Sequence, residues 1–533
     1  MKNIVLTRRQ LLKSLGALTL APGLVTTAWA ADATEPLNIG LAAPITTLDP
    51  HLESNAPNNA AATHLFDSLV VNDEKLHSRP GLATSWRTLD DTHWEFTLRE
   101  GVKFSDGTPF GPEDVKVSIA RATNIPSVAS FRTYTGTIKS VSAGTKPHTL
   151  IIETYAADPL LPNSLSRIRI ISAKFKDAPS ADFDAGRAAI GTGPYLFKAY
   201  VPGNSLHLVR NPAYWGTAPV WPEVTLRIVP DSGARVANLL SNGVDLTEQV
   251  PPEAMQRVKS DPRFHIVSGV SSRLVYIGAD MQRDVSPFVK DTAGNPLKKN
   301  PFKDLRVRQA VDMAINRQAI VERVMQGSAE VAAQYLPNGY PGTSSAILPT
   351  PYDPAKAKAL LAAAGYPNGF QVTLHGPNGR YVNDSKIVQA IAQMLTRIGI
   401  ATNVEVMPWS VYIAKASRAE FSLFLASWGV NTGETSNPLG AINATYDVKT
   451  GLGVSNWGRY SNPDFDAKLT TAIHLLDDAK RNALLAQASE IVFADRATIP
   501  LHFEKVTWAA KKSVGYLARA DQYTLAMNAT KLS

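Results

Sequence analysis

The chain has 533 residues, more than one hydrophobic core usually serves, with 44% hydrophobic and 19% charged residues. Its net charge is +8, but the first thirty residues hold four basic side chains and no acid, which leaves 50 basic against 46 acidic residues beyond them. This small surplus argues against a nucleic-acid partner. The absence of cysteine excludes disulfides, thiolate nucleophiles and a lipid-modified amino-terminal cysteine.

The amino terminus predicts a secretory signal peptide over residues 1–30. Arg8 and Arg9 precede an apolar stretch that is too short to span a membrane, and Ala28-Trp29-Ala30 follows as a small-residue cleavage triplet. The run T-R-R-Q-L-L-K resembles a twin-arginine export signal. Because Leu11 stands where an aromatic residue is often found, the general secretory route stays open. The mature protein is expected to be periplasmic, soluble and not a lipoprotein.

The elements expected in the first half are a strand at Leu37–Leu41, a strand beginning at His93, a helix opening at Pro112 and a strand at His148–Thr154. Apolar and polar residues alternate after His93, as in a half-buried strand. Proline followed by two acids suits the first turn of a helix. This region therefore predicts a mostly antiparallel sheet with local helices.

The second half alternates helices with strands, which predicts right-handed βαβ units and a mainly parallel sheet. Asp353 and Pro354 begin one of these helices, and Gly365 ends it. The other expected helices are Phe302–Asn316, Asp384–Ile398 and Ala479–Ala494, and the expected strands are Gln371–His375, Thr402–Val406, Phe421–Ala426 and Ile499–Phe503. The stretch Ser286–Pro301 fits a domain boundary and a solvated surface loop equally well.

Motifs that would indicate catalysis or a metal are missing from the sequence. The ten histidines are scattered singly, and there is no phosphate-binding loop or nucleophile elbow. We therefore expect no catalytic residues, no metal site and no cofactor.

Several longer motifs resemble the peptide/nickel-type solute-binding proteins of ABC importers, known as family 5. They occur in family order and are spread over most of the mature chain. The motifs are L-A-T-S-W from Leu82, F-T-L-R-E-G-V-K-F-S-D-G-T-P-F from Phe96, E-D-V from Glu113, G-T-G-P-Y from Gly191, R-N-P-A-Y-W from Arg210, R-V-R-Q-A from Arg306, and the helix Tyr352–Gly365 with its Y-P-N-G-F tail.

The resemblance implies an α/β, periplasmic-binding-protein-like two-lobe fold (type II, cluster C) with an extra inserted domain. Lobe one would comprise residues 31–73, 190–283 and 502–533. The inserted α+β domain would be 74–189, and lobe two would be 284–501. A ligand would be buried between the lobes and held only when they close.

Arg380 and Tyr381 are the first candidate ligand-binding residues. They lie in the connection after the strand that ends at His375, and loops at the carboxyl ends of parallel strands are common binding sites. In dipeptide-binding relatives an arginine in this connection receives the peptide carboxylate, which a guanidinium grips with two bonds. The alternative for Arg380 is an ordinary surface arginine.

The second candidate region is the loop after Phe421–Ala426, with Trp428, Asn431 and Glu434. Dipeptide-binding relatives carry an aspartate for the ligand ammonium near the place of Asn431, and a neutral amide holds an ammonium poorly. Glu434 would supply the missing charge if the loop folded inward, and otherwise is a solvated acid. Trp428, and less strongly Trp457, would pack against a ligand or belong to the core.

The resemblance thus implies the periplasmic binding component of an ABC importer, a monomer that captures a di- or oligopeptide and delivers it to a membrane permease with ATPase subunits. The departure at Asn431 keeps open a non-peptide solute, namely an opine, a sugar conjugate, glutathione or a metal chelate. An extracytoplasmic hydrolase is the remaining alternative, and it would need a nucleophile and a base in the cleft.

Overall fold

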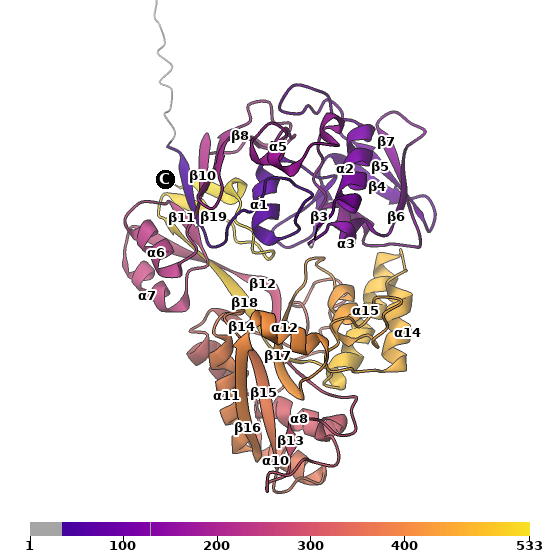
Figure 1. The fold of residues 1–533 in the computed structure, drawn as a ribbon, viewed down its shortest axis with the longest axis vertical. Helices are drawn as coiled ribbons and strands as arrows, with labels where there is room; N and C mark the ends of the chain where they lie inside the picture. Colours follow the sequence, from indigo (N-terminus) through magenta and orange to yellow (C-terminus); the bar gives the residue numbers. More distant parts are fainter. Residues whose placement is uncertain (1–34, 128, 533) are drawn as a thin grey trace, which may run out of the picture. The chain divides into compact units, whose positions relative to one another are not determined.

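A computed structural model describes residues 35–127 and 129–532, so the expected signal peptide lies outside the described residues. Two long antiparallel strands, β12 (Phe264–Ala279) and β18 (Ile499–Lys511), lie side by side in the middle of a twelve-stranded sheet (Figure 1). Their register shifts between Val270 and Leu274 and again between Val275 and Tyr276. The remaining strands of the sheet lie on either side of this pair, one group in lobe one and the other in lobe two.

On the side of lobe one the sheet continues in the order β18-β11-β1-β10-β9-β8. The predicted first strand is confirmed with the bounds expected, and it pairs in parallel with both β10 and β11. Trp508 of β18 is fully buried in the same core as Leu37 and Ile39. The elements are β1 (Leu37–Leu41), β8 (Tyr195–Val201), β9 (Ser205–Arg210), β10 (Glu223–Ile228), β11 (Leu246–Glu248), α1 (Ala56–Leu65), α6 (Ser232–Leu240) and α7 (Pro252–Ser260), followed near the carboxyl terminus by the ribbon β19 (Val514–Tyr516) and β20 (Ala529–Lys531).

The inserted region has its own four-stranded sheet, ordered β4-β5-β7-β6, and because all its pairs are antiparallel the expectation of a mostly antiparallel sheet is confirmed. In β5 the side chains of Trp94, Phe96 and Leu98 are buried while the residues between them are half-exposed, which confirms the alternation. The predicted helix begins at Pro112, and Asp114 accepts from the N–H of Gly111 at 2.8 Å. The elements are β2 (Val70–Asn72), β3 (Ser78–Pro80), β4 (Ala83–Thr88), β5 (His93–Leu98), β6 (Ile138–Ala143), β7 (Thr149–Thr154), α2 (Pro112–Asn124), α3 (Arg132–Thr135), α4 (Leu161–Leu165) and α5 (Ser180–Asp184).

On the side of lobe two, β15 pairs in parallel with β16 and with β17. The other pairs of this side, β12 with β17, β13 with β15 and β14 with β18, are antiparallel, so the expectation of a mainly parallel sheet holds only for three strands. The strands are β13 (Val289–Lys290), β14 (Ala329–Val331), β15 (Phe370–Asn378), β16 (Ile400–Pro408) and β17 (Leu423–Gly429).

The helices of lobe two are α8 (Leu305–Ala314), α9 (Arg317–Ala319), α10 (Pro354–Ala363), α11 (Asp384–Arg397), α12 (Trp409–Ser417), α13 (Ser436–Pro438), α14 (Pro463–Ala472) and α15 (Asp478–Ala494). The predicted start of α10 is confirmed, since the Asp353 side chain accepts from the N–H of Lys356 at 2.8 Å. Gly365 follows its end at φ +95°, a conformation in which glycine avoids the strain of a side chain. The buried face of α11 carries Ile387, Ile391 and Leu395.

The stretch Ser286–Pro301 is a loop, half of whose residues are exposed, and it carries β13 back onto the sheet of lobe two. Its proline and lysine content suits an exposed turn as well as a linker, so composition alone left both open. The chain passes between the two sides of the sheet along β12 and β18 instead, and β18 runs without a break through the expected boundary at residues 501 and 502. The other boundaries expected from the resemblance stay predictions.

Candidate ligand-binding site

A pocket of about 700 Å³ lies where β12 and β18 pass between the two lobes. Lobe one contributes Ala42 and the segments 230–235 and 249–253, and lobe two contributes residues 380–383. The two long strands supply Arg273 and residues 504–507. The volume is within the range typical of small-molecule sites, and residues from both lobes line it.

Arg380 and Tyr381, predicted from their place after a parallel strand, both line this pocket. Asp384, at the start of α11, holds their loop because its carboxylate accepts from the N–H groups of Gly379, Arg380 and Tyr381 at 3.2, 2.7 and 3.1 Å. The Arg380 side chain is exposed, and its guanidinium carbon lies 5.0 Å from the ring centre of Trp409. Among the described residues, no acid lies within 4.0 Å of it. Glu504, in the same pocket, lies beyond this distance, but the positive charge of Arg380 still opposes the rise in the Glu504 pKa. The arginine is therefore free of a direct ion pair and can bind an anionic ligand group.

The Tyr381 side chain is buried and meets the Trp409 ring edge to face at a centroid distance of 6.2 Å. Burial raises the pKa of Tyr381, so its hydroxyl stays protonated at neutral pH. Hydrogen bonding with Ser427 opposes this rise in pKa.

Sequence reasoning missed two charged residues on the long strands. Arg273 on β12 and Glu504 on β18 form an ion pair at 3.6 Å, and Arg273 also donates to Ser427 Oγ at 3.1 Å. Burial raises the pKa of Glu504, and the positive charge of Arg273 opposes that shift. Arg273 is the one Asp, Glu, Lys or Arg of β12, which was an available signal, whereas Glu504 is followed directly by Lys505 and does not stand out in β18. The pair lies at the place where the strands join the lobes.

Trp428 and Asn431 do not line this pocket. Trp428 is half-buried on β17, and its ring nitrogen donates to Asn437 Oδ1 at 2.8 Å. Asn431 is exposed, and its main-chain carbonyl accepts from Arg167 of the inserted region at 2.6 Å. The next carbonyl, of Thr432, accepts from Asn163 Nδ2 at 3.1 Å. The loop after β17 therefore contacts the inserted region through its backbone.

Glu434 and Trp457 also lie outside the pocket. The Glu434 carboxylate is buried, with Arg481 Nε at 3.0 Å and Ser436 Oγ at 2.7 Å. The loop does fold inward, but the charge of Glu434 is neutralised by Arg481. Trp457 is half-buried, with its ring centre 6.2 Å from that of Tyr412 and 5.9 Å from that of Phe424. Both residues thus contribute to the packing of lobe two.

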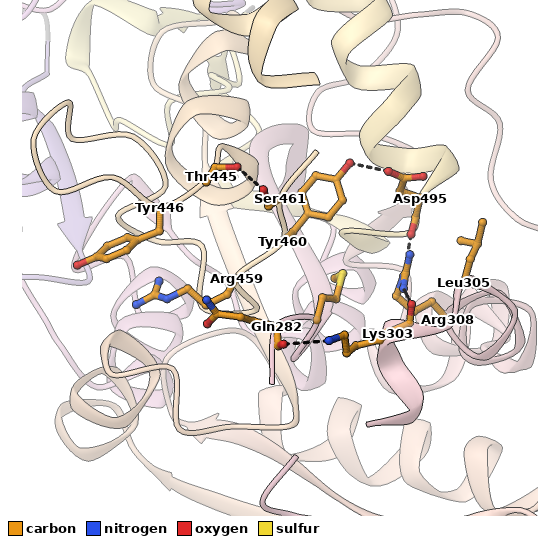
Figure 2. Close-up of a pocket in the computed structure, with 11 residues that line it drawn as sticks. Gln282, Lys303, Leu305, Arg308, Thr445, Tyr446, Arg459, Tyr460, Ser461 and Asp495 are labelled. Atoms are coloured by element: carbon orange, nitrogen blue, oxygen red, sulfur yellow. Dashed lines mark hydrogen bonds between the residues drawn. The ribbon is translucent and has the colours of Figure 1, made fainter. Parts of the chain in front are cut away.

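Figure 2 shows another pocket, of about 590 Å³, that is built within residues 281–495 alone. Its polar groups contact one another, since Tyr460 donates to the Asp495 carboxylate at 2.6 Å and Arg308 donates to the Asp495 carbonyl at 2.8 Å. The Arg459 guanidinium lies 3.9 Å from the ring centre of Tyr446. Apart from Met281 and Gln282, which follow directly after β12, the residues that line this pocket belong to lobe two.

Among the described residues, no cluster of three or more histidine, aspartate or glutamate side chains is arranged to hold a metal ion. A search of the same residues for helices of membrane-spanning length and hydropathy found none.

Comparison with known proteins identifies the family. The family model described as bacterial extracellular solute-binding proteins, family 5 middle, matches residues 78–450. Heme-binding protein A of Haemophilus influenzae is 28% identical over 476 residues, which cover 83% of this chain and 82% of that protein. The glutathione-binding protein GsiB of Salmonella typhi is 27% identical over 510 residues, which cover 94% of this chain and 95% of that protein.

A solved structure with the same fold is that of the ABC transporter-associated periplasmic binding protein DppA from Helicobacter pylori in complex with the peptide STSA. It superposes with a TM-score of 0.70 at 23% identity and covers 93% of this chain and 98% of that one. The two-lobe α/β fold expected from the sequence motifs is thereby confirmed. The chain belongs to family 5 of the bacterial extracellular solute-binding proteins.

Proposed function

We propose that this protein is the periplasmic binding component of an ABC importer, which captures a peptide or peptide-sized solute between its lobes and delivers it unchanged to a membrane permease. The observation that carries the proposal is the pocket of about 700 Å³ between the lobes, with an unpaired arginine at its lobe-two wall. We further propose that the amino-terminal signal directs export of the protein and that the mature protein is a monomer.

Arg380 would receive the carboxylate of the ligand, and Tyr381 lines the same wall of the pocket. Both side chains are on lobe two, while Ala42 and the start of α6 face them from lobe one. A ligand that contacts both walls is held fully only when the lobes are closed, so its binding energy favours the closed form. The known relatives support a ligand of this size, since one is a glutathione-binding protein and another was solved with a bound peptide.

A non-peptide solute is the second candidate; the acids that line the pocket are Asp231, Glu253 and Glu504, whereas Asn431 and Glu434 lie outside it. Asn431 carries no charge, and the nearby Glu434 carboxylate is occupied by Arg481 and Ser436. Neither residue therefore offers a free negative charge to a ligand ammonium. Under this alternative the fold and the Arg380 contact are unchanged, and the ligand is an organic anion other than a peptide.

Native mass spectrometry of the protein as purified, followed by calorimetry with the ligand it carries, tests both proposals. The Arg380→Ala variant should bind a carboxylate ligand more weakly by about 2–5 kcal/mol, because the other half of a desolvated charge pair is left alone. The matched control is Arg418→Ala, an exposed arginine of lobe two paired with Glu420, which should bind normally. Equal affinity of wild type and Arg380→Ala would remove this arginine from the site, and chemical conversion of the ligand would refute the transport role.

A further inference from the structure

A second pocket, of about 580 Å³, lies between α1, the segment after α4 and the carboxyl-terminal residues 519–528. It shares no lining residue with the pocket at Arg380. Three arginines, two aspartates and three large aromatic side chains line it: Arg167, Arg169, Arg519, Asp67, Asp521, Tyr214, Trp215 and Tyr523.

Two of these arginines are buried beside each other without a counter-charge. Arg167 and Arg169 are each 8% exposed, and among the described residues no carboxylate lies within 4.0 Å of either guanidinium. Arg169 donates to Ser68 Oγ at 3.0 Å and Thr63 Oγ1 at 2.8 Å. Arg167 donates to the Tyr523 hydroxyl at 3.0 Å and to the carbonyl of Asn431. All these partners are neutral, and burying charge without compensation costs several kcal/mol per ion.

The acids of the pocket supply part of the missing charge. Burial lowers the pKa of Arg167, but Tyr523, Tyr134 and Asp521 raise it overall, and Asp67 opposes the lowering of the Arg169 pKa. Asp521 accepts from Arg519 at 2.6 Å and so neutralises the third arginine. Asp67 accepts from Thr192 Oγ1 at 2.9 Å and from the Trp215 ring nitrogen at 2.8 Å, and burial raises its pKa to about 6. Burial, with repulsion from Arg167 and Arg519, lowers the pKa of Arg169 to about 10. The pocket therefore keeps an excess of positive charge.

An unsatisfied amide adds an independent sign of a missing occupant. Asn72 lines the same pocket, and neither its side-chain nitrogen nor its side-chain oxygen has a hydrogen-bond partner among the described residues, although both atoms are buried. Buried polar groups are nearly always hydrogen-bonded, and one that is not calls for an explanation.

We propose that this pocket is an anion-binding site that takes a small solute bearing a carboxylate or phosphate group. The planar guanidinium groups of Arg167 and Arg169 bind such an oxyanion with paired, charge-assisted hydrogen bonds. Tyr214 and Trp215 present ring surface to the remainder of the solute. The inference does not depend on the peptide proposal, because the two pockets have separate walls.

The test is isothermal titration calorimetry of the full mature protein with citrate and, separately, with inorganic phosphate, against sodium chloride at matched ionic strength. All titrations use the Arg380→Ala background, so that a carboxylate bound in the other pocket is not counted. We expect saturable binding of at least one anion, and the comparison between citrate and phosphate separates the two chemistries. Binding of neither anion would overturn the proposal.

Arg169→Met should weaken anion binding at least tenfold, while the control Arg87→Met should leave it unchanged. Arg87 is an exposed arginine of the inserted region that pairs with Glu95. Arg167→Lys keeps the positive charge but loses the planar guanidinium that forms paired hydrogen bonds. It replaces Arg169→Met as the test variant if that variant does not fold, and the same tenfold loss of affinity is expected. Unaltered anion affinity in whichever of these two pocket variants folds would show that the arginines are structural.

Discussion

Replacing Arg481 with methionine is expected to lower the free energy of unfolding by about 3–5 kcal/mol, because it leaves a buried carboxylate without its counter-charge. The Arg481 and Glu434 side chains are 7% and 4% exposed, and Nε lies 3.0 Å from the carboxylate. After the substitution only Ser436 Oγ, at 2.7 Å, would still contact Glu434.

The reverse change, Glu434→Gln, is expected to cost less, about 1–2 kcal/mol. Arg481 would keep Asp478 at 2.7 Å and the Leu475 carbonyl at 3.2 Å, and Asp478 is 81% exposed, so the arginine retains one hydrated counter-charge. The double variant Glu434→Leu with Arg481→Met should recover much of the stability, since an apolar pair of similar volume needs no desolvation of charge.

Urea unfolding of the four proteins, followed by tryptophan fluorescence, measures these differences, and ligand titration of Glu434→Gln is run beside it. The control is Arg418→Met, whose exposed pair with Glu420 should be worth about 0.2–1 kcal/mol. The reasoning is refuted if Arg481→Met costs no more than the control. A Glu434→Gln protein of unchanged stability that no longer binds ligand would instead place Glu434 in the ligand site.

Two further predictions concern pH and backbone conformation. His502 on β18 is fully buried with no partner for either ring nitrogen among the described residues, and burial lowers its pKa to about 4 from 6.5. The unfolded chain therefore binds the extra proton first, so the stability contributed by the neutral ring is complete above pH 6.5 and is lost as the pH falls towards 4, by roughly 3 kcal/mol. The loss of stability between pH 6.5 and 4 should be smaller by that amount in His502→Leu; an unaltered pH profile would contradict this. Gly365→Ala and Gly369→Ala both place a side chain at positive φ, but a Cβ at residue 365 meets nothing within 4 Å, whereas at residue 369 it would lie 1.7 Å from the carbonyl of Gly399. We expect a loss of about 1 kcal/mol for the first from strain alone and more than 3 kcal/mol for the second, and equal thermal melting temperatures would disprove the steric argument.

The sequence predicts the local elements well because their signals are local. The alternation after His93 and the Asp353 cap each involve residues within a few positions of one another, and both are confirmed. The sheet of lobe two is predicted less well. A strand pattern does not show which neighbour it pairs with, so the antiparallel partners β12 and β13 were not expected beside the parallel strands.

The residues of the candidate site also differ in how far local sequence signals predict them. Arg380 could be placed because the end of a parallel strand is a sequence feature with a spatial meaning. The partnership of Arg273 with Glu504 depends on two neighbouring strands that are far apart in the sequence, and no spacing in the chain reveals it. For Glu434, the sequence offered an inward-facing loop as one of two alternatives. It did not indicate the partner, because Arg481 lies on a helix that no sequence pattern connects to that loop.

The last strand of the central sheet has a consequence for the order of folding. Residues 280–498 leave β12 and return to β18 at adjacent paired positions, so that whole stretch can collapse as soon as it is synthesised. Lobe one cannot, because β11 needs β18 as its neighbour and the core around Leu37 needs Trp508 and Ala526. Lobe one, which begins with β1, therefore completes its folding only after β18 and the residues beyond it are synthesised. If synthesis stopped at residue 503, lobe two would be able to fold, whereas β11 and the core around Leu37 would lack Trp508 and Ala526.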